Sequence, residues 1–332
     1  MQYDFPSLFV HPPNSERELF SNINRYISLF EPMGKLKIKP APPKDIQQLE
    51  QIVISKFGQA IPSSYKAYLE RMGEEDGGLV SHVMDCDLEY WNYFKGYNMA
   101  RGAKHKIDDV KMRVHIEHIL NSSPVAPPFW YFYYTMLTGV GWGFSSEGTP
   151  PDQIVETHGN RFYFSHDTFT KLLFYCAYIF VEDYVDNHST VLGYGVDSMD
   201  FLPCETEGSY SIRFRAECPK EWLAPGHAPL VNFLSEIETQ FSIEECWFSG
   251  NKEFNLFDAK DDITSINYSF SRYVGVHVPS NLAIRINYIQ SYGPEVLVSV
   301  LCQNVCYAKQ IVDSILQQVK LKKGSFRVLF ID

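Results

Sequence analysis

The chain has 332 residues, a formal net charge of −11 and a hydrophobic share of 45%. Single hydrophobic cores stop growing near about 250–300 residues, so the length predicts two domains, and the apolar content excludes a disordered chain. Negative charge repels phosphate backbones, which weighs against general nucleic-acid binding and favours a basic protein partner, although acidity can also serve solubility alone.

Three features bear on the compartment. The first ten residues lack the basic start of a secretory signal peptide, and no apolar run approaches the roughly 20 residues needed to cross a bilayer. The seven cysteines are odd in number and scattered, which favours reduced thiols over a disulfide framework. We therefore expect a cytoplasmic protein without membrane association.

The N-terminal part predicts three amphipathic helices, each bounded by residues that start or stop a helix. Proline is tolerated where the first N–H groups have no partner, and glycine readily takes the left-handed conformation of a helix end. The first helix follows Asn14-Ser15, the second runs from Pro42-Pro43 to Gly58, and the third from Pro62 to Gly73. The second and third must pack together, because the turn between them is very short.

Strands are expected after residue 128. The aromatic block over 129–134 favours a strand, and residues 153–157 and 161–164 predict a hairpin. The glycine-rich segment 139–143 is expected to be a turn that packs Trp142. Asp167 is expected to cap a helix that continues to residue 180.

These elements predict an α+β fold in which a module of helices and an antiparallel sheet precedes a second α/β sandwich domain; a ferredoxin-like topology is one candidate for the latter. The expected divisions are a helical extension (1–34), a first domain (35–185), a linker rich in Asp, Ser and Gly (186–208) and a second domain (209–332). Within the second domain we expect helices over 229–241 and 308–319 and strands over 210–215, 246–249, 254–257, 283–289, 296–301 and 326–331.

The segment from Asp45 to Gly78 resembles the signature of the SUKH superfamily, also called the Smi/Knr family. Further matches follow in order, so the resemblance covers about 35–185; the Asn-Gly turn of the family is displaced here by Glu74-Glu75-Asp76. The matching residues are Ile46, Leu49, Glu50, Ile61-Pro62, Tyr65, Leu69, Gly77-Gly78, Pro151-Asp152, Ile154-Val155, Asp167, Thr168, Phe169 and Leu173.

The resemblance implies a SUKH-like domain that binds proteins and carries no catalytic residues. Bacterial members are commonly immunity proteins that neutralise toxins, and eukaryotic members act in cell-wall regulation or as adaptors. We therefore expect an immunity protein that occludes the active site of a secreted, basic toxin, for instance a nuclease. A regulatory adaptor or scaffold is the alternative, and an enzyme whose site lies in 209–332 is a third candidate.

Acidic residues mixed with large aromatics follow the third predicted helix. Aromatic anchors supply affinity and charges steer the encounter, so this mixture is typical of a protein-binding surface. A solvated loop beside ordinary core aromatics is the alternative. The candidate partner-binding residues are Glu74, Glu75, Asp76, Asp85, Asp87, Glu89, Trp91 and Tyr93.

No motif predicts a cofactor, a metal site or catalysis. His115 and His118 could share one helix face as half of a metal site, but no third ligand can be placed beside them. For Cys302 and Cys306, small buried hydrophobes are favoured over a redox pair. The glycines of 139–143 lack the spacing of a phosphate-binding loop, and no G-x-S-x-G nucleophile motif is present. We expect a chain that is not an enzyme.

Overall fold

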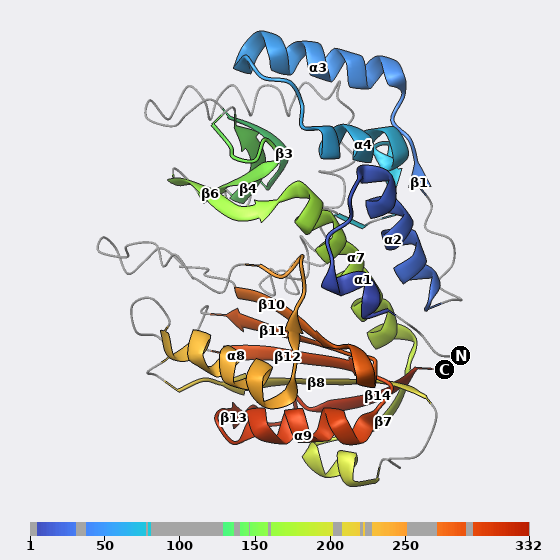
Figure 1. The fold of residues 1–332 in the computed structure, drawn as a ribbon, viewed down its shortest axis with the longest axis vertical. Coiled ribbons are helices and arrows are strands. Elements are labelled where there is room, and N and C mark those ends of the chain that lie inside the picture. Colours follow the sequence, from blue (N-terminus) through green and yellow to red (C-terminus); the bar gives the residue numbers. More distant parts are fainter. Residues whose placement is uncertain are drawn as a thin grey trace. The chain divides into compact units, whose positions relative to one another are not determined.

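The structure is a computed structural model that describes residues 5–30, 38–77, 79–80, 129–135, 140–145, 147–158, 161–201, 208–219, 222, 228–250, 271–289 and 295–331. Its contacts divide the chain into two compact units, which we name the N-terminal unit (Pro13–Val181) and the C-terminal unit (Met1–Pro12 with Glu182–Asp332). Both combine helices with antiparallel sheets, so the predicted α+β class is confirmed (Figure 1).

The described residues of the N-terminal unit form three complete helices, the first part of another and two small antiparallel sheets. The helices are α2 (Glu16–Ser28), α3 (Pro43–Phe57), α4 (Ser63–Met72) and α7 (Phe169–His188), whose end belongs to the C-terminal unit. A two-stranded sheet pairs β1 (Ile38–Lys39) with β2 (Glu75–Asp76). The other sheet has the order β3 (Phe129–Thr135), β4 (Val140–Ser145), β5 (Gln153–His158) and β6 (Arg161–Thr168).

The ends of α2, α3 and α4 lie where the capping residues predicted them. Ser15 caps α2, because its side chain accepts a hydrogen bond from the Glu18 N–H at 3.2 Å. Gly58 ends α3 in the left-handed conformation, with φ of 68°. Pro62 immediately precedes α4, and Gly73 follows it.

An aromatic cluster joins the helices of this unit to its sheet. The Tyr65 ring of α4 lies 5.6 Å from Trp130 of β3, 5.4 Å from Phe144 of β4 and 5.2 Å from Phe169 of α7. Such tilted and edge-on contacts add about 0.5–1.5 kcal/mol per pair to the burial of apolar area. Two residues of the SUKH resemblance, Tyr65 and Phe169, therefore meet in one core.

Two predictions in this unit are wrong. Most of the glycine-rich segment expected as a turn is β4, whose Gly143 and Gly141 lie in register with Tyr131 and Tyr134 of β3. Pairing on both sides favours extended backbone there. The cap of α7 is Thr168, whose Oγ1 accepts from the Lys171 N–H at 3.2 Å, because β6 extends through the expected cap Asp167.

The C-terminal unit is built on an eight-stranded sheet in which every described pair of strands is antiparallel. The spatial order is β7-β14-β8-β12-β11-β10-β9, with β13 pairing β8. The strands are β7 (Thr190–Tyr194), β8 (Ser209–Glu217), β9 (Glu244–Glu245), β10 (Ser271–His277), β11 (Leu282–Ile289), β12 (Glu295–Cys302), β13 (Lys320–Leu321) and β14 (Arg327–Ile331). The helical elements are α1 (Ser7–Val10), α8 (Ala228–Phe241), α9 (Val305–Leu316), η3 (Val196–Phe201) and η6 (Val278–Ser280).

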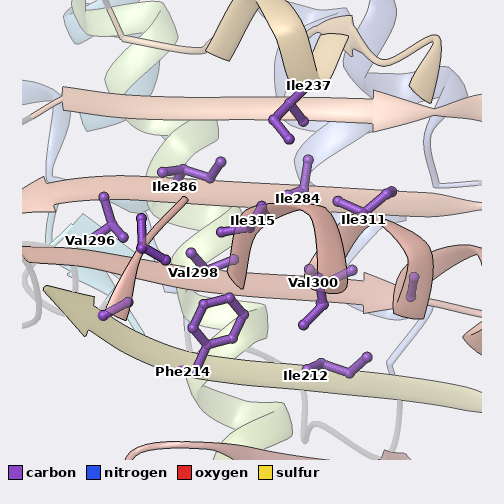
Figure 2. Packing of buried hydrophobic residues seen from close by; sticks show 14 of the residues in the cluster. Ile212, Phe214, Ile237, Ile284, Ile286, Val296, Val298, Val300, Ile311 and Ile315 are labelled. Carbon is purple, nitrogen blue, oxygen red and sulfur yellow. The ribbon is translucent and has the colours of Figure 1, made fainter. Parts of the chain in front are cut away.

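One face of this sheet forms the hydrophobic core of the unit with α8 and α9. Alternate residues of the central strands, such as Ile212 of β8 and Ile284 of β11, pack against Ile237 of α8 and Ile311 of α9 (Figure 2). These four side chains are fully buried. The period of two along each strand therefore assigns β-branched residues to the helix-covered face.

The observed boundaries correct three expectations. The expected linker contains β7, which pairs with β14, so residues 190–194 are part of the sheet. The expected N-terminal extension is divided, because α2 packs in the N-terminal unit through Tyr26, whose ring lies 6.2 Å from Tyr178, whereas α1 belongs to the other unit. Residues 246–249 form a turn, with Ser249 N–H donating to the Cys246 carbonyl. The expected strand over 254–257 lies outside the described residues.

Candidate functional site

The second face of the large sheet carries a row of arginines. Cross-strand register places Arg285 of β11 opposite Ser299 of β12, Ser299 opposite Arg213 of β8, and Arg213 opposite Arg327 of β14. The side chains of Arg285 and Arg213 are 6% and 8% exposed. Burying guanidinium groups costs several kcal/mol each unless charged partners lie beside them, so this row needs carboxylates.

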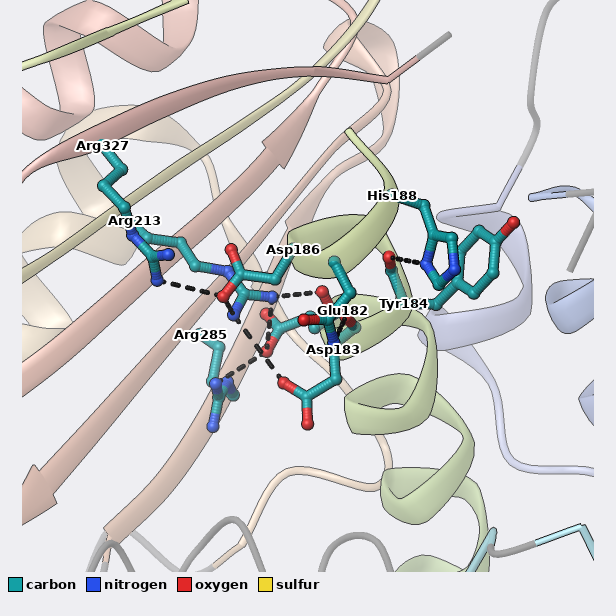
Figure 3. A network of polar contacts seen from close by, with 9 residues as sticks. Glu182, Asp183, Tyr184, Asp186, His188, Arg213, Arg285 and Arg327 are labelled. Carbon is teal, nitrogen blue, oxygen red and sulfur yellow. Dashed lines mark hydrogen bonds and ion pairs between the residues drawn. The ribbon is translucent and has the colours of Figure 1, made fainter. Parts of the chain in front are cut away.

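The end of α7 supplies these carboxylates (Figure 3). Glu182 Oε2 lies 2.7 Å from Arg285 Nη2, an ion pair without hydrogen-bond geometry. Asp186 Oδ2 lies 2.9 Å from Arg213 Nη1 and 3.0 Å from Arg327 Nη2. Arg213 also donates to the Glu182 carbonyl at 2.5 Å. Since Glu182 and Asp186 are four residues apart, one helix face presents both acids.

This network balances its own charge and functions as a structural contact. Asp183 adds a third carboxylate, 3.8 Å from Arg213, so three acids face three arginines. The charges of these six described side chains therefore balance, which leaves them no net charge to recruit an ionic ligand. Arg213 follows and precedes apolar residues, Ile212 and Phe214, so the sequence already marked a charged side chain within a strand. Its pairing with Glu182, 31 residues earlier in the chain, could not be predicted without the fold.

The described cysteines are poorly suited to nucleophilic chemistry. Burial raises the pKa of Cys302 and of Cys218 to about 12, and burial also raises the pKa of Cys246. Raised values suppress the reactive thiolate. Cys176, Cys218, Cys246 and Cys302 are free, whereas Cys306 is disulfide-bonded, so the prediction of reduced thiols is wrong at Cys306.

The acidic residues predicted to bind a partner have different environments. Glu74 pairs with Lys39 at 2.5 Å, where β1 and β2 meet, and Glu75 lies in β2. Asp76 is 4% exposed, and its Oδ2 accepts from the Tyr68 hydroxyl and the Val80 N–H, each at 3.0 Å. Asp76 is therefore a buried acceptor that holds the turn, and its assignment as a surface contact is wrong. Asp85, Asp87, Glu89, Trp91 and Tyr93 lie outside the described residues.

A pocket of about 320 Å³ lies within the N-terminal unit, where the first turns of α2, α4 and α7 meet. The Asp152 carboxylate anchors it, since Oδ2 accepts from the Ser64 and Thr170 hydroxyls, both at 3.1 Å. The Asp152 carbonyl also accepts from the Phe169 N–H at 2.9 Å. The other polar lining residues include Asn14, Glu16 and Ser63.

The charge of this pocket follows from its acids and its helix ends. Hydrogen bonds from its own backbone N–H and from the Ser63 hydroxyl lower the pKa of Glu16, which keeps that carboxylate ionised. Three helix N-termini contribute about half a positive charge each, whereas Glu16 and Asp152 contribute two negative charges. Among the described residues that line the pocket, none is Lys, Arg or His. The balance is slightly negative and favours a ligand that donates hydrogen bonds or carries positive charge.

Sequence reasoning missed this pocket. Its signal was the coincidence of three helix starts, Ser15, Pro62-Ser63 and Thr168, each beside a short polar side chain. Two of its segments, Ile61-Pro62 and Pro151-Asp152, were quoted for the SUKH resemblance, but only the fold brings them together.

Within the described ranges, no set of three or more His, Cys, Asp or Glu side chains is arranged to hold a metal ion. His115 and His118 lie outside those ranges.

None of the helices in the described part of the chain combines the length and the apolar character that a membrane crossing requires.

Comparison of the chain with known protein families, with curated proteins and with solved structures finds no match. The SUKH resemblance therefore rests on the residues that carry it.

Proposed function

We propose that this chain is a protein-binding protein with a SUKH-like N-terminal module, and that it neutralises a secreted bacterial toxin by occluding the toxin's active site. The observation that carries the proposal is the pocket whose described lining includes Glu16 and Asp152 but no basic side chain. A lysine or arginine of a basic partner would enter this pocket as an anchor, donating hydrogen bonds to the two carboxylates.

The net charge of −11 supports the same partner class, because long-range attraction accelerates encounter with a basic protein. A basic toxin such as a nuclease fits this chemistry. Inhibition would be steric and electrostatic, with no covalent step and no cofactor. The raised pKa values of the buried thiols support a role without nucleophilic catalysis.

The finer assignment of the C-terminal unit is also proposed. The strand order β14-β8-β12-β11, with α8 and α9 in the connections β8–β11 and β12–β14, supports a ferredoxin-like core to which β7, β9 and β10 are added.

A cytoplasmic location is supported by the free thiols of Cys176, Cys218, Cys246 and Cys302. The disulfide at Cys306 opposes it, since reducing compartments disfavour such bonds.

The test is affinity capture from the native organism with tagged full-length protein, at low and moderate salt, read by mass spectrometry. Wild type is compared with Glu16→Lys, which reverses charge in the pocket, and with Glu70→Lys, which makes the same change on the exposed side of α4. The expected result is one basic protein in a 1:1 complex, lost with Glu16→Lys and retained with Glu70→Lys.

Equal loss of the captured protein with both variants would refute the role of the pocket in binding, because the net charge of the chain would then explain the interaction. Recovery of several unrelated housekeeping proteins in place of one toxin would favour the regulatory adaptor, the alternative function. A purified toxin whose activity is unaffected by the bound chain would refute inhibition while leaving binding intact.

A further inference from the structure

The Asp152 carboxylate has one oxygen engaged and one oxygen open to a ligand. Oδ2 accepts from two hydroxyls, those of Ser64 and Thr170, each at 3.1 Å. A carboxylate oxygen offers about two lone-pair positions, so both positions of Oδ2 are occupied. No donor among the described residues reaches Oδ1, and Asp152 keeps part of its surface exposed in the lining of the pocket. A ligand in the pocket therefore meets Oδ1 alone.

Two other residues of the lining add acceptors. The Glu16 carboxylate already accepts from its own backbone N–H and from the Ser63 hydroxyl, so roughly half of its acceptor capacity remains. The Asn14 side-chain nitrogen donates to Glu18 Oε2 at 3.1 Å, which leaves the amide oxygen as the acceptor of that side chain. Asp152, Glu16 and Asn14 thus supply acceptors from three separate side chains.

The remainder of the lining suits an alkyl chain. Its apolar members are Pro13, Leu19, Pro62 and Pro151. Lysine and arginine lay their methylene stems against such apolar surface while their charged heads bind polar groups. A metal ion fits less well, because the described residues bring together no group of three acidic, histidine or cysteine side chains. The pocket therefore favours a side chain with an alkyl stem and a cationic head.

We propose that the pocket takes a lysine of the partner and discriminates against arginine, an inference that rests on the function proposed above. A guanidinium binds best as a planar fork, with two parallel N–H groups on the two oxygens of one carboxylate. Asp152 does not offer that pair of oxygens, because Oδ2 is occupied by the two hydroxyls. An ammonium directs its three N–H groups to separate acceptors, and Asp152, Glu16 and Asn14 provide them.

The partial exposure of the pocket reduces the main penalty against lysine. An ammonium holds water more strongly than a guanidinium, so complete burial would favour arginine. Glu16 and Asp152 are only partly buried, and Asn14 is exposed. A lysine head bound to them therefore keeps part of its hydration, and the arrangement of acceptors decides between the two cations.

The experiment compares Nα-acetyl-lysine methylamide with Nα-acetyl-arginine methylamide as probes of the full-length chain. Saturation-transfer NMR titrations at low salt give a dissociation constant for each compound. We expect the lysine compound to bind at least about fivefold more tightly, the effect of one charge-assisted hydrogen bond in a partly hydrated site. Glu16→Gln should weaken its binding by a similar factor, whereas Glu70→Gln, the same change on the exposed side of α4, should leave it unchanged.

A double variant tests the physical reason for the preference. Ser64→Ala combined with Thr170→Val removes both hydroxyls from Asp152 Oδ2 with little change in side-chain volume. Both oxygens can then accept a guanidinium fork, so the arginine compound should gain affinity until it matches or exceeds the lysine compound. Thermal unfolding checks that the double variant is folded, and the wild-type comparison decides the preference even if it is not.

Equal or tighter binding of the arginine compound to the wild-type chain would overturn the proposal, and so would the absence of binding by either compound. A lysine preference that persists unchanged in the folded double variant would overturn the role of Oδ2. Capture of a basic toxin by a chain without the lysine preference would refute that preference alone. Lysine selectivity in a chain that captures no toxin would refute the proposed function alone.

Discussion

Replacement of Glu182 tests whether the arginine row depends on α7. Glu182→Gln keeps the shape of a side chain that is 2% exposed but removes one carboxylate beside Arg285 and Arg213. Removing one member of a buried ion pair costs about 3–5 kcal/mol, because the remaining charge stays desolvated. The matched control is Glu217→Gln, whose pair with Lys320 spans 3.7 Å at 53% and 82% exposure, and which should cost about 0.5 kcal/mol or less.

Hydrogen exchange read by mass spectrometry on peptides from β8 and β11 measures this difference where the arginines lie. At about 1.4 kcal/mol per factor of ten, Glu182→Gln should lower protection there by roughly a hundredfold to a few thousandfold. Glu182→Met combined with Arg285→Met should recover most of the loss, since apolar replacement of a buried pair is often neutral. Less than a fivefold change with Glu182→Gln would refute the reasoning.

Three further results are expected. Because burial raises the pKa of Cys302 to about 12, its alkylation by iodoacetamide at pH 8 should be at least tenfold slower in the native chain than after urea unfolding, followed by mass spectrometry; equal rates would contradict burial. Gly58→Ala should lower stability by about 1–2 kcal/mol in thermal unfolding, whereas Gly58→Asn should cost less. The cost arises from backbone strain alone, since φ is +68° and a Cβ added at this position would have no neighbouring atom within 4 Å. Burial lowers the pKa of His277 from 6.5, so the unfolded chain binds the proton more readily and stability falls as pH drops below about 6.5; His277→Phe should flatten that part of the pH–stability curve, and an unchanged slope would show that another group titrates there.

Local rules predicted the elements whose signals lie within a few residues. Ser15 and Gly58 fix the ends of their helices through their own side chain or backbone, so α2 and α3 could be placed from sequence. The alternating apolar residues of β11 and β12 likewise predicted strands. For such elements, the residues within the element are sufficient to predict its type and its ends.

Features that depend on pairing could not be predicted in this way. β7 lies in a segment rich in Asp, Ser and Gly, and only its register with β14 makes it a strand. The pocket needs three helix starts from distant parts of the chain. Asp76 was assigned to the surface by its charge, and its burial follows from contacts with Tyr68 and Val80 that composition does not encode.

The two faces of the large sheet constrain each other. A slip of one residue in β8 would turn Arg213 toward Ile284 and Ile311 and would turn Ile212 toward the acids of α7. Both changes would bury charge without a partner, at a cost of several kcal/mol. The arginines therefore disfavour a one-residue slip of β8, even if the ion pairs add little net stability.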